Sequence, residues 1–193
     1  MDWEQLYQKG DTHWDRGRPS PPLEQWLAQN TLNGRIAVIG CGRGHDVALL
    51  AKSGADVLGL DIAPTAIADA KKNYGEFSDR FRVADLFDVP TDLRAAFDVV
   101  IEHTCLSGLP PDLRSQYRAG IDALLRPDGR VVGVWFIQPD LDPGEVGPPF
   151  PLPVPALDAL FAEGYEVVED YIPDVAYEGR EGRERLRVLR RFV

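Results

Sequence analysis

Short apolar runs alternate with segments of helical periodicity from about residue 34 to the end of the chain. This alternation is typical of parallel strands connected by helices that lie on the two faces of one sheet. The expected strands are residues 35–39, 55–60, 80–84, 96–102, 130–137, 165–172 and 184–193, the last two as an antiparallel pair. The sequence therefore predicts an α/β fold with a doubly wound, mostly parallel, seven-stranded sheet.

Capping residues and prolines place the expected helices around these strands. Pro64 suits the first turn of a helix, and Asp112 can act as an N-cap. Seven prolines in residues 139–155 favour a stiff, extended loop, because proline cannot continue a helix or a central strand. The expected helices are residues 3–10, 22–30, 45–53, 64–74, 112–125 and 156–163.

Composition restricts the partners of the 193-residue chain. Asp and Glu number 31 against 21 Lys and Arg, a net charge of −10, whereas nucleic-acid binding relies on basic groups. The longest apolar run, about residues 131–137, is far short of the roughly 20 residues that span a membrane. The first residues do not resemble a signal peptide, and two cysteines are too few for a disulfide framework or a structural zinc site. We therefore expect one cytoplasmic, monomeric domain, 1–193, with no nucleic-acid, membrane or metal partner.

A glycine-rich turn follows the first expected strand. Gly40, Gly42 and Gly44 lie between that strand and a helix, where the chain must turn tightly and can approach a ligand closely. The helix start also offers free N–H groups and a positive dipole end. The spacing is G-x-G-x-G and differs from the G-x-G-x-x-G of pyrophosphate-binding dinucleotide folds.

Two aspartates end the second and third strands at the same edge of the expected sheet. Asp61 can accept hydrogen bonds from both ribose hydroxyls of a nucleoside, and Asp85 from an adenine amino group. Two carboxylates beside a glycine turn suit an adenosine that carries a cationic sulfonium, and so favour S-adenosylmethionine. An ordinary strand-to-helix turn with aspartate caps is the bland alternative. A nicotinamide dehydrogenase is another, but no Tyr-x-x-x-Lys pair is visible.

At this point the sequence resembles class I S-adenosylmethionine-dependent methyltransferases. Within them it resembles the thiopurine S-methyltransferase family, and especially its thiol and halide methyltransferase branch. The resemblance covers essentially the whole chain and implies a Rossmann-like fold with residues 1–33 as a helical lid over the cofactor. The segments that carry it are residues 3–7, 12–18, 39–47, 59–62, 109–111, 147–150 and 179–186.

The resemblance implies roles for individual residues. The aromatic side chains Trp3, Tyr7 and Trp14 become candidate lid residues, although rings that merely anchor a helix to the core are an alternative. The other cofactor-binding candidates are Gly40, Gly42, Asp61, Asp85, Leu86 and His103.

Further candidates concern the methyl acceptor. His103 is a candidate general base or a wall residue, since it stands where the family has tyrosine. Arg114 is a candidate for steering an anionic nucleophile, or a surface arginine. Phe150 is a candidate wall of the acceptor pocket, or part of a rigid connection.

The implied activity is methyl transfer from S-adenosylmethionine to a small soft nucleophile. A thiol is the first expectation, with thiopurine and halide acceptors in the same class. Oxygen, nitrogen or metalloid acceptors remain as alternatives, although the Asn/Asp-Pro-Pro-Tyr motif of many amino-group methyltransferases is missing. A non-catalytic module that only binds S-adenosylmethionine is the alternative from another class.

Overall fold

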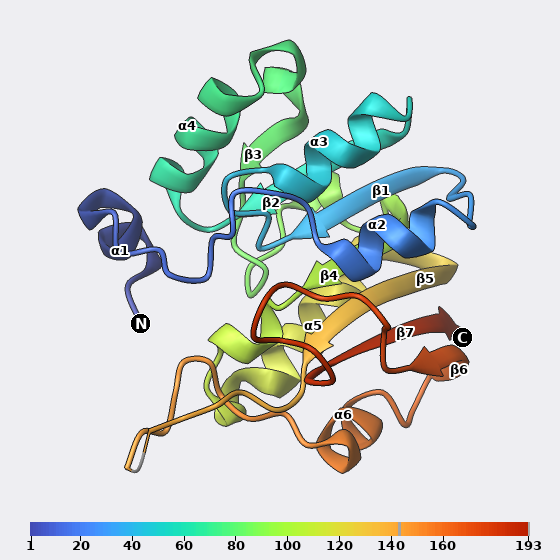
Figure 1. Cartoon of the computed structure of the whole chain (residues 1–193). Helices are drawn as coiled ribbons and strands as arrows, with labels where there is room; N and C mark the ends of the chain where they lie inside the picture. The colour runs from blue at the N-terminus through green and yellow to red at the C-terminus, as the bar shows by residue number, and fades with distance from the viewer. Residues whose placement is uncertain (143, 193) are drawn as a thin grey trace.

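Seven strands form one sheet in the order β3-β2-β1-β4-β5-β7-β6 in the computed structural model, which describes residues 1–142 and 144–192 (Figure 1). β1 to β5 pair in parallel, and β7 runs antiparallel to both of its neighbours. This confirms the doubly wound, mostly parallel sheet and its antiparallel final pair. The strands are β1 (Arg35–Ile39), β2 (Asp56–Asp61), β3 (Phe81–Val83), β4 (Phe97–His103), β5 (Leu125–Phe136), β6 (Tyr165–Tyr171) and β7 (Glu184–Arg191).

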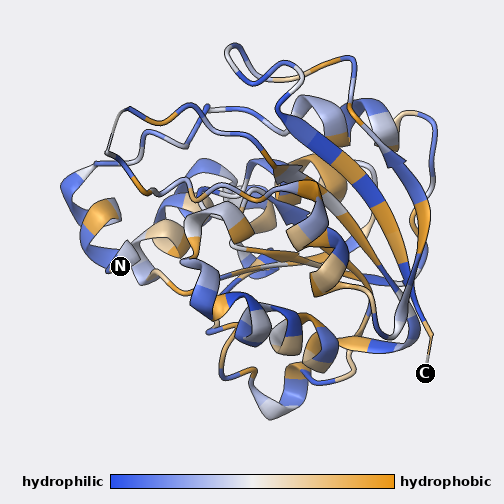
Figure 2. Ribbon diagram, turned by 90° about the horizontal axis from the view of Figure 1, so that it is seen from below, coloured by the Kyte–Doolittle hydropathy of each residue, from blue (hydrophilic) through white to orange (hydrophobic). Residues whose placement is uncertain are grey.

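Helices cover both faces of the sheet, which is why its central strands are almost continuously apolar. Helices α2, α3 and α4 pack on one face with Ile36 and Val38 of β1. Helices α5 and α6 pack on the other face with Ala37 and Ile39 of the same strand. Figure 2 shows the strands at the centre of the molecule largely in the hydrophobic colour. The helices are α1 (Trp3–Lys9), α2 (Pro21–Leu27), α3 (His45–Lys52), α4 (Pro64–Asn73), α5 (Arg114–Leu124) and α6 (Val154–Leu160).

Short 3-10 helices complete several connections. η3 and η4 lie between β4 and α5, at the carboxyl end of the sheet. Helix α1 packs outside the sheet on the start of α4, where Tyr7 meets Ala63 and Ala66. The 3-10 helices are η1 (Gly75–Arg80), η2 (Thr91–Leu93), η3 (Leu106–Gly108) and η4 (Pro111–Leu113).

The predicted boundaries around α5 were wrong. Asp112 lies in η4 and caps nothing; α5 begins at Arg114, and its N-cap residue Leu113 makes no side-chain hydrogen bond. β5 begins at Leu125, five positions before the expected start, because Leu125 pairs with Phe97 of β4. The Pro-Asp-Gly sequence that follows in β5 coincides with an irregularity in the pairing of β4 with β5, and the strand begins before it.

The proline-rich segment before α6 is irregular where the structure describes it, as expected. α6 begins at Val154 and ends at Leu160, slightly earlier than the predicted 156–163. Pro143, within the expected loop, and Val193, at the end of the last expected strand, lie outside the described residues. Among the described helices none is long and apolar enough to cross a membrane.

Candidate active site

A cavity of about 670 Å³ lies at the carboxyl ends of β1 to β4. Its position follows from the topology: β1 has β2 on one side and β4 on the other, so the connections diverge there and leave a crevice. Ligand sites for small molecules have volumes of roughly 300–1,000 Å³. The wall is formed by the glycine turn, the segments after β2, β3 and β4, the N-terminal segment, and residues from the loops before α6 and β7.

The glycine turn after β1 forms one wall of this cavity. A side chain at Gly40 is excluded, because its Cβ would lie 2.7 Å from the sulfur of Cys105. The turn leads into α3, whose N-cap Gly44 offers no side-chain hydrogen bond to the first N–H groups of the helix. Backbone and free N–H groups are therefore left to face a ligand, as the sequence predicts.

Asp61 connects the end of β2 to this turn. Its carboxylate accepts hydrogen bonds from the backbone N–H of Gly42 at 2.8 Å and of Ala63 at 2.9 Å. Burial raises the pKa of Asp61, and these N–H groups oppose the rise. The residue lines the cavity together with Gly40 and Gly42, so the structure brings these three candidates to one place.

Asp85 and Leu86 line the same cavity after β3. The Asp85 carboxylate accepts the N–H of Phe87 at 2.8 Å and so stabilises the turn that presents it. Leu86 packs on α5, where a Cβ at Gly120 would lie 2.2 Å from the Leu86 carbonyl oxygen. The position of this loop is therefore determined by close contact with a helix of the same hydrophobic cluster.

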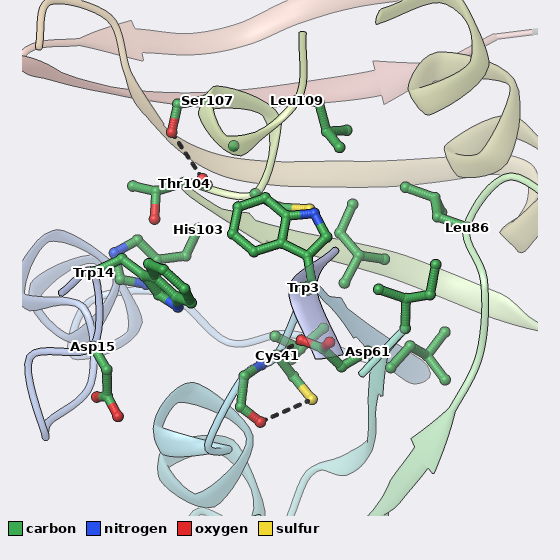
Figure 3. A pocket seen from close by; sticks show the side chains of 18 of the residues that line it. Trp3, Trp14, Asp15, Cys41, Asp61, Leu86, His103, Thr104, Ser107 and Leu109 are labelled. Atoms are coloured by element: carbon green, nitrogen blue, oxygen red, sulfur yellow. Dashed lines mark hydrogen bonds between the residues drawn. The ribbon is translucent and has the colours of Figure 1, made fainter. Parts of the chain in front are cut away.

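The three aromatic lid candidates meet at the cavity, and Figure 3 shows two of them, Trp3 and Trp14. The ring of Trp14 packs edge-to-face against Trp3 at 5.3 Å and against Tyr7 at 5.7 Å. The indole N–H of Trp14 donates to the Tyr7 hydroxyl at 3.3 Å. Trp3 extends across to η3, where a Cβ at Gly108 would lie 3.0 Å from the indole ring. All three predicted lid residues therefore line the cavity.

An ion pair and hydrogen bonds that were not predicted from the sequence connect the N-terminal segment to the glycine turn. Asp15 accepts from Arg43 at 2.7 Å and contacts His45 at 2.9 Å. These partners hold the pKa of Asp15 well below its usual range, although burial opposes them. Arg43 also donates to the hydroxyl of Thr12 at 3.0 Å. The partners lie about 30 positions apart in the sequence, so no local pattern indicates them.

His103 lies at the end of β4 and lines the cavity. Its Nδ1 is 2.8 Å from a carboxylate oxygen of Asp46, and its ring stacks on Tyr177 at 5.7 Å. Arg180 lies beside them and forms a buried ion pair with Glu184. Asp46, Tyr177 and Arg180 also line the cavity and were not among the predicted residues.

Arg114 and Phe150 are not among the residues that line the cavity. The Arg114 guanidinium donates to the carbonyl of Pro151 at 2.6 Å, and partial burial lowers its pKa. The backbone N–H of Phe150 donates to the carbonyl of Ser107 at 2.6 Å. Arg114 holds the proline-rich loop to the start of α5, and Phe150 holds it to the segment between β4 and α5. Pro148 and Pro149 of that loop reach the cavity.

Comparison with known proteins decides the family. The sequence pattern of the thiopurine S-methyltransferases matches residues 1–190. The chain belongs to the thiopurine S-methyltransferase family. It is 31% identical to thiocyanate methyltransferase 1 and 29% identical to probable thiol methyltransferase 2, both from Arabidopsis thaliana. Each alignment covers 95% of this chain and 82% of the relative.

The fold agrees with this membership of the thiopurine S-methyltransferase family. A solved methyltransferase from Methanosarcina mazei superposes with a TM-score of 0.73 at 18% identity, covering 91% of this chain and 99% of that one. The protein is therefore an S-adenosylmethionine-dependent methyltransferase with the class I fold. The glycine cradle and the uncapped start of α3 fit this cofactor, whose charged amino-acid end needs a close backbone approach. Among the described residues, no cluster of three or more His, Cys, Asp or Glu side chains could hold a metal ion.

In this member of the thiopurine S-methyltransferase family, Glu102 has a structural role next to the cavity. It is fully buried and accepts from the N–H of Cys105 at 2.6 Å and from the Tyr117 hydroxyl at 2.9 Å. Burial raises the pKa of Glu102 to about 7. The carboxylate thereby holds the turn after β4 against α5.

This raised pKa predicts a pH-dependent stability. Between the unfolded value of 4.5 and the folded value of about 7, the folded protein binds more protons than the unfolded one, so stability falls as pH rises. The Glu102 contribution to the free energy of unfolding falls by about 2–3 kcal/mol from pH 5 to pH 8. Glutamine does not titrate, so the free energy of unfolding of Glu102→Gln should not show this fall. Measured by urea unfolding, the difference between the variant and the wild type should therefore shift by about 2–3 kcal/mol in favour of the variant from pH 5 to pH 8. A difference between the two proteins that does not change with pH contradicts the prediction.

Proposed function

We propose that this methyltransferase transfers the methyl group of S-adenosylmethionine to a small thiol. Soft anions such as thiocyanate or iodide belong to the same acceptor class. The observation that carries the proposal is the cavity at the carboxyl ends of the strands, in which the aromatic rings of Trp3, Tyr7 and Trp14 lie over the proposed cofactor wall. A cavity of about 670 Å³ that also holds the cofactor leaves room only for a small acceptor. The named activities of the two Arabidopsis relatives point to sulfur nucleophiles.

The residues divide the work between binding and exclusion of water. Bound S-adenosylmethionine supplies an electrophilic methyl group. Asp61 is proposed to hold the ribose and Asp85 the adenine amino group, with Leu86 against the adenine ring. Trp3 and Trp14 keep water out and present aromatic faces to positive charge. A thiolate loses its charge as it attacks a sulfonium, so a dry site lowers the barrier, and alignment of the two reactants supplies much of the remainder.

Arg114 and Phe150 are proposed to act on the cavity indirectly, through the proline-rich loop. Through Pro151 and Ser107 they position the loop that carries Pro148 and Pro149 to the cavity. We propose that they shape the acceptor side through this loop. The protein is proposed to act as a single domain with residues 1–33 as the lid.

A titration by calorimetry with S-adenosylmethionine and with NAD tests the cofactor, and an acceptor panel tests the reaction. The panel contains thiols, iodide and hydroxylated aromatic compounds, and release of S-adenosylhomocysteine is measured. We expect release with thiols first. Selective binding of S-adenosylmethionine without release on any thiol contradicts the proposed acceptor class. Binding of NAD alone contradicts the cofactor site as well.

The lid predicts a specific loss in Trp14→Ala. The ring of Trp14 contacts both Trp3 and Tyr7, so its removal opens the cover of the cavity. We expect S-adenosylmethionine affinity to fall about tenfold, since an aromatic face near a desolvated cation contributes about 1–2 kcal/mol. Calorimetry measures this, with Trp14→Phe as the matched control that keeps the aromatic face. Equal affinities of the alanine and phenylalanine variants contradict the lid.

A further inference from the structure

His103 and Asp46 form a partly buried pair whose hydrogen-bond pattern fixes one tautomer. One carboxylate oxygen of Asp46 accepts the backbone N–H of Ser20 at 2.8 Å, and the other lies 2.8 Å from His103 Nδ1. An ionised carboxylate can only accept, so Nδ1 of the neutral ring carries the proton. The lone pair is therefore on Nε2.

The second ring nitrogen of His103, Nε2, differs from Nδ1 in its hydrogen bonding. It is buried and has no hydrogen-bond partner among the described residues. A buried polar atom left without a partner costs about 1–3 kcal/mol, so such an atom is usually satisfied by a ligand or water. The ring lies on the cavity wall, with Tyr177 stacked on it, and Figure 3 shows His103 beside Thr104 on the side of Trp14.

A second histidine–aspartate pair shows what a purely structural pair looks like in this chain. His45 contacts Asp15 through Nε2 at 2.9 Å and the Tyr74 hydroxyl through Nδ1 at 2.7 Å. Both of its ring nitrogens are engaged, so it has no site left for a proton from another molecule. His103 differs in this one respect.

We infer that His103 accepts the proton of a neutral thiol at Nε2, and that Asp46 is the positioning residue that fixes the imidazole for this transfer. The inference rests on the proposed function and narrows its substrate class to acceptors that enter with a dissociable proton. The S–H bond of the acceptor breaks, its proton binds Nε2, and its electron pair stays on sulfur. That pair forms the new bond to the methyl carbon while the carbon–sulfonium bond breaks, leaving its electrons on the sulfur of S-adenosylhomocysteine. The imidazolium then returns its proton to solvent.

The charges around the ring support this direction of transfer. Burial by itself lowers the pKa of His103, but Asp46 on α3 and Glu184 on β7 outweigh it and raise the pKa, against a smaller opposing effect of Arg180. Tyr177 is uncharged, because burial raises its pKa. The environment thus stabilises an imidazolium, which is the form that results when a thiol gives up its proton.

The test compares a thiol that must lose a proton with one that has already lost it. Phenylmethanethiol is neutral at pH 7, whereas 4-nitrothiophenol is ionised, so only the first needs a base. We expect the ratio of the two methylation rates to fall on the order of 10²-fold in His103→Gln. In Asp46→Asn the ratio should fall similarly. The Ser20 N–H keeps the amide oxygen on its side, so the amide N–H faces Nδ1 and leaves the proton on Nε2.

His45→Gln is the matched control, in which both rates are free to fall but their ratio should stay as in wild type. An unchanged ratio in His103→Gln and Asp46→Asn overturns the inference while leaving thiol methylation established. A wild-type protein that methylates neither thiol instead overturns the proposed function on which the inference rests.

A second readout needs no turnover. The chain has three histidines, so their imidazole signals in a nitrogen-labelled sample are assigned by single substitutions. In the complex with S-adenosylhomocysteine, saturating phenylmethanethiol should raise the pKa of His103, because the thiolate stabilises the imidazolium. The same addition should have no such effect in Asp46→Asn. A His103 titration that does not respond to the thiol in the wild-type protein contradicts the inference.

Discussion

Replacing Asp61 with alanine is expected to weaken S-adenosylmethionine binding by about 100-fold or more. The carboxylate accepts the N–H groups of Gly42 and Ala63 and faces the cavity, so its loss removes the brace of the glycine turn together with the proposed ribose contacts. Hydrogen bonds to charged groups contribute about 1.5–3 kcal/mol each, and two of them account for a change of this size.

Calorimetry with S-adenosylmethionine measures the effect. Asp56→Ala is the matched control: it removes a carboxylate from the other end of β2, where the side chain is 64% exposed and pairs with Arg80 away from the cavity. We expect its affinity to equal that of wild type. Asp61→Ala with wild-type affinity would show that the cofactor lies elsewhere.

Gly44→Ala is expected to destabilise the protein by about 3 kcal/mol, because two costs add at this position. The backbone of Gly44 has φ +85°, which costs an L-residue about 1–2 kcal/mol. A Cβ would also lie 2.5 Å from the ring of Phe81, which is buried in the core and cannot move aside freely. Overpacking of this kind adds about 1–3 kcal/mol.

Gly54→Ala separates the two costs. Gly54 has a similar φ of +86°, but no atom lies within 4 Å of a Cβ there. Urea unfolding should therefore show a loss of only about 1–2 kcal/mol, from backbone strain alone. Equal losses in the two variants contradict the contact with Phe81. Gly44→Ala should also weaken cofactor binding, since the residue begins the helix that faces the cavity.

The sequence predicts those parts of the fold whose cause is local. β1 spans Arg35 to Ile39 as predicted, because its apolar residues 36–39 are buried on both faces of this central strand. The start of α5 was missed, since its N-cap Leu113 carries no capping side chain. The early start of β5 was missed because pairing with β4 overrides the turn signal of Pro127.

The site divides in the same way. Gly40 and Asp85 follow strands and Asp61 ends one, all at the carboxyl edge of the sheet, so the strand pattern alone brings them together. Asp46 and His103 lie 57 positions apart, and only the fold, which brings the start of α3 to the carboxyl end of β4, makes them neighbours. A contact between residues so far apart in the sequence produces no local pattern from which it could be predicted.

The ion pair of Asp15 with Arg43 and its hydrogen bond with His45 also have a consequence for the rate of catalysis. They attach the N-terminal segment to the glycine turn at which we propose that the cofactor binds, so on this proposal spent cofactor leaves only after these contacts have separated. In many enzymes such an opening step, and not the chemistry, limits turnover. Because the Asp15 and Arg43 side chains are only 13% and 25% exposed, salt screens their attraction weakly. The dwell time of S-adenosylhomocysteine should therefore change little with ionic strength.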